Sequence, residues 1–150
     1  MRIMLLLALS LCLSGISYAQ NPETFASIQK LLNKAEGKKI MDLVGNDEKI
    51  GKQKYTVSAI SIEKVGQGKY SSTWIFDYSN INWSGFNWYL WDENSNDKVK
   101  RLRIEFKNPV SYSMHTKDKT GEMRTTNSID LYFLAKDYDE MERLFENSTR

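Results

Sequence analysis

Few side chains in this sequence could carry out acid–base or nucleophilic chemistry. The chain has one histidine, His115, and one cysteine, Cys12. Catalysis needs groups that transfer a proton or attack an electrophile, held close together, and a lone histidine is more often a surface or hydrogen-bonding residue. The spacing of His and Cys does not match a metal site either. We therefore predict no catalytic residue, no metal site and no cofactor.

Three other patterns fall short of the motifs they approach. The segment DENSND at 92–97 is rich in oxygen atoms but lacks the order of a calcium-binding loop. The segment VGQGK at 65–69 lacks the glycine spacing of a phosphate-binding loop. A glycosidase needs two converging carboxylates, and nothing in the sequence shows that any two acidic residues of the strand-rich half converge. Those residues are Asp77, Asp92, Glu93 and Glu105.

An aromatic segment at 74–91 gives the strongest indication of binding. Eight of its eighteen residues are Trp, Tyr or Phe, and all four tryptophans of the chain lie in it. Successive side chains of a strand point to opposite faces. Tyr70, Trp74, Phe76 and Tyr78 therefore share one face of the first strand that enters this segment. A single buried face explains that strand completely.

The second strand of the segment, at 85–93, is apolar on both faces. Phe86, Trp88 and Leu90 lie on one face, and the other carries Tyr89 and Trp91. Two interpretations remain open for this second face. The N-terminal helix covers it, or it stands exposed and binds a sugar ring or a peptide. The candidate ligand-binding residues are Trp83, Asn87, Tyr89, Trp91 and Asp92.

The first nineteen residues have the layout of a secretory signal peptide. Arg2 precedes an apolar run from Ile3 to Leu13, and small residues lead to a cleavage site after Ala19. The apolar run is too short to span a bilayer. We expect an exported chain, periplasmic or extracellular, with no stable membrane span after processing. In the alternative, the chain is a lipoprotein anchored through Cys12.

The remaining residues, 20–150, are predicted to form one domain. Removal of Arg2 lowers the formal net charge from +2 to +1, and a nearly neutral chain is not typical of a nucleic-acid-binding protein. Without Cys12 the chain can form no disulfide, so it depends on its hydrophobic core, for which its length suffices. The partner is unknown, an envelope protein or a glycan, and the oligomeric state is open.

The periodicity of the chain predicts an α+β fold. An N-terminal helix begins after Asn21, with Pro22 in its first turn, and ends near Gly37. The segment 38–45 is a short helix or a strand. A C-terminal helix after Asp137 carries an apolar stripe on one face. Between the helices, strands are predicted at 54–65, 69–79, 85–93, 98–106, 108–116 and 128–135.

This order of elements resembles that of pleckstrin-homology-like barrels. The ending SIDLYFLAKDYDEMERLFEN, a last strand that runs directly into an amphipathic helix, carries the resemblance, which extends over about residues 52–147. It implies an antiparallel sheet or partly closed barrel of six or seven strands, with the C-terminal helix packed on it. Such barrels often bind phosphoinositides through basic residues of the first hairpin. Here that hairpin offers Lys64 and Lys69, and we do not extend the lipid site to this chain.

Two functions remain as hypotheses. In the first, the protein is a small exported binding or interaction module that acts without catalysis through an aromatic-rich sheet surface. In the second, it is an exported glycan-binding or glycan-cleaving protein that uses Tyr89 and Trp91 as a stacking platform. A helix over these two residues would favour the first hypothesis, and two converging carboxylates beside them would favour the second.

Overall fold

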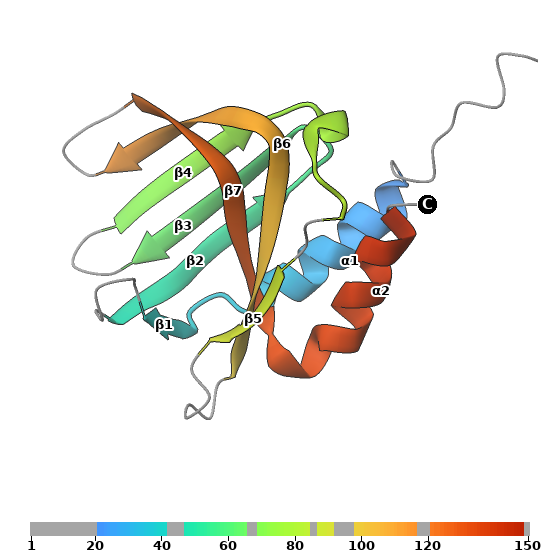
Figure 1. Cartoon of the computed structure of the whole chain (residues 1–150). Coiled ribbons are helices and arrows are strands. Elements are labelled where there is room, and N and C mark those ends of the chain that lie inside the picture. Colours follow the sequence, from blue (N-terminus) through green and yellow to red (C-terminus); the bar gives the residue numbers. More distant parts are fainter. Residues whose placement is uncertain are drawn as a thin grey trace, which may run out of the picture.

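A computed structural model describes residues 21–41, 47–65, 69–84, 87–91, 98–116 and 121–148. The order of elements is a helix, seven strands and a second helix, with short 3-10 turns after β4 and β7. All strand pairings are antiparallel, and the two helices lie side by side at one end of the curled sheet (Figure 1). The predicted α+β fold is thus confirmed.

Helix α1 (Pro22–Asn33) begins as its sequence predicts. The Asn21 side chain accepts a hydrogen bond of 2.9 Å from the Glu23 amide, and Pro22 occupies the first turn. The helix ends earlier than expected, at Asn33, and the chain then turns through Gly37, whose φ of 80° suits glycine. Ile28, Leu31 and Leu32 form its buried stripe.

Strands β1 to β4 form one half of the sheet in chain order. They span Lys39–Met41, Asp47–Tyr55, Ala59–Val65 and Lys69–Ile75. The prediction of a single strand over 54–65 is wrong, because the chain turns at 56–58, where the Thr56 hydroxyl accepts from the Ala59 amide. The hairpin of β3 and β4 is confirmed.

A bulge in β2 keeps the side chains before and after it on the inner face of the sheet. The register with β3 shifts between Ile50 and Gln53, so Glu48, Ile50, Gln53 and Tyr55 all become buried. At Gly51 the two strands approach so closely that a Cβ atom there would lie 2.6 Å from the Cβ of Glu63.

The other half of the sheet is built on β6 (Val99–Thr116), the longest strand. Its first part pairs with β5 (Asn87–Trp91), and its last part pairs with β4. On its other edge it pairs with β7 (Glu122–Leu134), with a register shift between Glu105 and Val110. Two separate strands were predicted over 98–116, and that prediction is wrong, because the chain continues through Pro109 as one bent strand.

Helix α2 (Tyr138–Ser148) closes the main core. Its Met141, Leu144 and Phe145 are buried, which confirms the predicted stripe. The ring of Phe145 lies 5.8 Å from that of Tyr55 on β2. The main core between the helices and the sheet also contains Ile28, Leu31, Leu32, Ile60, Ile62, Phe76, Tyr78, Ile81, Leu102, Ile104, Phe106, Val110, Ile129, Leu131 and Phe133.

The sheet does not close into a barrel by strand pairing. Among the described residues, β7 pairs only with β6, and the side chain of Gln53 on β2 takes the place of a strand at its outer edge. The Gln53 amide donates to the Tyr132 carbonyl at 2.7 Å and accepts from the Tyr132 N–H at 2.9 Å. A second core of Ala35, Ile40, Ile50, Val99 and Tyr132 fills the space around this junction.

A second glutamine side chain covers the edge of β2. Gln29 on α1 donates to the Gln53 carbonyl at 2.7 Å and accepts from the Tyr55 N–H at 2.9 Å. These backbone groups would otherwise be left without partners beside a helix, which costs free energy. Two side-chain amides therefore satisfy the two sheet edges that meet near α1.

Candidate binding face of the sheet

The candidate site lies on the inner face of the sheet, at the end away from the helices. The register places Trp74 beside Ile60 and Tyr112, so this face is continuous with the main core. We call five residues of β4 and β6 the inner-face strip: Tyr70, Ser72, Trp74, Tyr112 and Met114. All of them except Ser72 are only half-buried.

The centre of the strip is a pair of stacked rings. The rings of Trp74 and Tyr112 have centroids 5.2 Å apart and planes inclined by 25°. The indole nitrogen of Trp74 is buried and has no hydrogen-bond partner in the described part of the chain. The neighbouring Ser72 is 6% exposed. The strip thus holds one buried donor that has no acceptor among the described residues.

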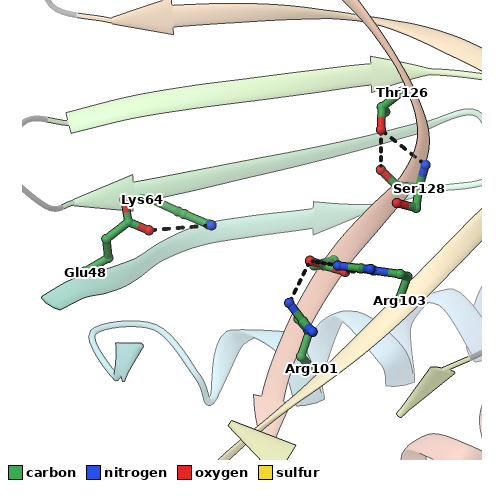
Figure 2. A network of polar contacts seen from close by, with 7 residues as sticks. Glu48, Lys64, Arg101, Arg103, Thr126 and Ser128 are labelled. Carbon is green, nitrogen blue, oxygen red and sulfur yellow. Dashed lines mark hydrogen bonds and ion pairs between the residues drawn. The ribbon is translucent and has the colours of Figure 1, made fainter. Parts of the chain in front are cut away.

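A charge cluster adjoins the strip at Tyr70. We define it as Glu48, Lys64, Arg101, Arg103 and Asp130, which come from four strands. The Tyr70 hydroxyl donates to Glu48 at 2.9 Å, and the Lys64 ammonium lies 3.5 Å from the other oxygen of that carboxylate. Figure 2 shows Glu48 on β2 and Lys64 on β3.

The other half of the cluster joins β6 and β7. Arg103 holds the Asp130 carboxylate with two bonds of 2.8 and 3.1 Å, and Arg101 approaches it at 3.4 Å (Figure 2). A two-bond contact of this kind is the strong form of an ion pair. The ammonium of Lys64 connects the two halves, because it lies 5.2 Å from the centre of the Tyr132 ring.

Burial and neighbouring side chains shift the pKa values of Lys64 and of the adjoining Tyr70. Burial lowers the pKa of Lys64, but Tyr132, Tyr70 and Glu48 together raise this pKa above its ordinary value. For Tyr70, burial raises the pKa, Lys64 opposes the rise, and the bonded Glu48 adds to it, which gives a pKa of about 12. Lys64 is therefore charged and Tyr70 neutral near pH 7.

The structure describes the predicted site residues only in part. Trp83 is half-buried, with its ring 4.9 Å from Tyr78 at the border of the main core. The register assigns backbone positions 87, 89 and 91 to the face of β6 that carries Arg103, Arg101 and Val99. Asp92 and the side chains at 87–91 lie outside the described residues.

Sequence reasoning missed the inner-face strip for a specific reason. Tyr70 and Trp74 were assigned to a buried face together with Phe76 and Tyr78. The aromatic rings on that face are buried only in its second half, where Phe76 and Tyr78 belong to the main core. Alternation indicates which face points inward, but it contains no information on how far the helices reach.

A separate polar hollow of about 630 Å³ lies between α1 and the outer side of β2 and β3. Its two glutamines are engaged with backbone groups, and Glu63 pairs with Lys69 at 3.2 Å. Its lining residues are Gln29, Asn33, Glu36, Lys52, Gln53, Lys54, Ser61 and Glu63.

In the described segments, no three His, Cys, Asp or Glu side chains gather as metal ligands. None of the helices in these segments has the length and apolar character needed to cross a membrane. The chain matches no family model, no curated protein and no solved structure.

Proposed function

We propose that this protein is an exported binding module that holds its ligand without covalent chemistry on the inner face of its sheet. The observation that carries the proposal is the inner-face strip. It combines half-buried aromatic rings with a buried indole N–H, that of Trp74, which lacks an acceptor among the described residues, and buried polar groups in native proteins are normally hydrogen-bonded. A ligand that supplies acceptors would remove that deficit.

Binding is proposed rather than cleavage because of the state of the nearby carboxylates. Glu48 is bonded to Tyr70 and Lys64, and Asp130 is held by two arginines. A glycosidase acid must give its proton to the leaving group, and its partner carboxylate must reach the sugar. Carboxylates engaged by several cations and hydroxyls are better suited to fixing the geometry of a binding surface.

Export rests on the sequence of residues 1–19, which lie outside the described part of the chain. Their basic start, apolar run and small residues before Gln20 are typical of a cleaved secretory signal. The partner would then be an envelope protein or a glycan, in the periplasm or outside the cell. Mass spectrometry of the native product tests this part: a chain that begins at Gln20 supports export, whereas lipid on Cys12 or an intact N-terminus contradicts the processing proposed here.

The binding proposal is tested by an unbiased ligand screen on residues 20–150. Small acids, peptides and oligosaccharides are ranked by their effect on the melting temperature, and each hit is measured again with Trp74→Leu. The matched control is Ser71→Ala, on the opposite face of the same strand. We expect hits that Trp74→Leu abolishes and Ser71→Ala preserves. A screen in which no hit depends on Trp74 would overturn the proposal.

A further inference from the structure

Cleavage after Ala19 would give the exported chain a reactive N-terminus. The first residue would then be Gln20, so this inference rests on the export part of the proposed function. Glutamine is special at the start of a chain, because its own side-chain amide lies within reach of its α-amine. The precursor holds that nitrogen in the peptide bond to Ala19, so the amine becomes a nucleophile only on cleavage.

The reaction open to Gln20 closes a five-membered lactam. The α-amine attacks the side-chain amide carbon, a new C–N bond forms, and the bond from that carbon to the amide nitrogen breaks. One proton passes from the amine to the leaving nitrogen, which departs as ammonia. No oxidant, cofactor or second molecule is required, and two groups held in one residue react far faster than two free molecules.

The described chain begins at the protein surface, directly after this position. Asn21, Pro22 and Glu23 are all exposed. The Asn21 side chain accepts from the Glu23 amide at 2.9 Å, and the Asn21 carbonyl accepts from the amides of Thr24 and Phe25 at 3.0 and 3.3 Å. None of these bonds uses a group of the preceding residue. A ring closed at that residue would therefore leave the cap of α1 intact.

A charged N-terminus would be unfavourable at this place. A free α-amine has a pKa of about 7.7–8.0, so it is largely protonated near pH 7. Cleavage after Ala19 puts this ammonium one residue before the cap residue Asn21, next to the helix end where the dipole is positive and a cation is destabilising. Lactam formation replaces the ammonium by a neutral amide, as N-terminal acetylation does.

The start of α1 matters for the rest of the domain. The ring of Phe25 lies 5.2 Å from that of Tyr55 and 5.9 Å from that of Tyr78, and Gln29 of the same helix binds the edge of β2. An exopeptidase acting on a free N-terminus would work toward this part of the helix. We propose that Gln20 is a modification site, which becomes pyroglutamate after export and blocks the N-terminus of the domain.

The test uses the full precursor, expressed in a host that exports it, with the product purified from outside the cytoplasm. The intact mass is measured at once, before any digestion. We expect a mass that is lower by one ammonia than that of unmodified residues 20–150. Pyroglutamate aminopeptidase should then shorten the chain by one residue, whereas a general aminopeptidase should leave it unchanged.

The matched control is Gln20→Asn, which keeps the amide but would have to close a strained four-membered ring. This variant should keep its α-amine and its full mass, and a general aminopeptidase should shorten it. A mature chain that begins at Gln20 with a free amine overturns this inference while export stands. An equal loss of ammonia from Gln20→Asn also overturns it, because the reaction would then lie elsewhere. A product that retains residues 1–19 overturns both this inference and the proposed export.

Discussion

The two ends of the inner sheet face differ in how they are covered. At the helix end, Ile60, Phe133 and Phe145 are 0–1% exposed and lie in an apolar core. At the other end, Tyr70 and Trp74 are half-buried, and polar atoms alternate with rings. One strand, β4, runs between these environments. The difference shows that the apolar core fills only the helix end of this face, so the rings at the other end keep part of their surface exposed.

The largest expected effect lies at the helix end. Phe145→Ala should lower the free energy of unfolding by about 3–5 kcal/mol, because it removes a fully buried ring and leaves a cavity beside Tyr55. Urea denaturation measures the change. A loss under about 1 kcal/mol would mean that α2 does not complete the core.

The junction between the two halves should give the next largest effect. Gln53→Met keeps the length of the side chain but leaves the N–H and C=O of Tyr132 without partners in a buried place. The expected loss of stability is about 2–4 kcal/mol, since each unsatisfied group costs about 1–3 kcal/mol. Gln29→Met is the matched comparison, and it should cost less because Gln29 is only half-buried. Equal losses of stability for Gln53→Met and Gln29→Met would mean that the hydrogen bonds at the edge of β7 stabilise the fold no more than those at the edge of β2.

At the end of the inner face away from the helices, a substitution should change the free energy of unfolding only slightly. Trp74→Ala removes a half-buried side chain, so we expect a loss of about 1–2 kcal/mol, below the 3–5 kcal/mol that is typical of a fully buried tryptophan. Thermal melts of this variant and of Phe145→Ala, under identical conditions, make the comparison directly. If Trp74→Ala unfolds the protein as severely as Phe145→Ala, the two ends are one core and the strip is no binding site.

The smallest expected effect on stability comes from the Tyr70 phenol and appears only in alkaline solution. The Tyr70 phenol has a pKa of about 12 in the folded protein, above its ordinary value of 10.0, so the folded state holds this proton more tightly. The resulting stability is complete below pH 10 and is lost as the pH rises toward 12. Tyr70→Phe should lose less stability than the unchanged protein between pH 10 and 12. The difference should stay under about 1 kcal/mol, because solvent screens a half-exposed group.

Periodicity predicted the helices and their buried residues well. The Asn21 cap and the stripe of α2 follow from local patterns of side chains, and both are confirmed. Strand boundaries were predicted less well. The turn at 56–58 contains no glycine or proline, so the pattern around Val57 looks like continuous strand. Conversely, Pro109 indicates a break, yet β6 continues through it with a shift of register.

The candidate site could be predicted only in part. The sequence indicated that aromatic residues at 74–91 are too many for one buried face, but it directed attention to Tyr89 and Trp91 rather than to Trp74. The charge cluster was missed altogether. Glu48 and Asp130 are 82 positions apart (130 minus 48), and they come to one face only because the bend in β6 carries β7 across β2. No local pattern encodes that bend.

The glutamine junction also has a consequence for the order of folding. The hydrogen bonds between Gln53 and Tyr132 join residues 79 positions apart, and α1 packs against α2, the last helix of the described chain. Contacts between distant positions slow folding, since a long loop must close before they form. A chain emerging from the ribosome can pair β2 with β3, but it cannot complete its core until residues 141–145 have been synthesised. Folding of this domain is therefore expected to wait until α2 has left the ribosome.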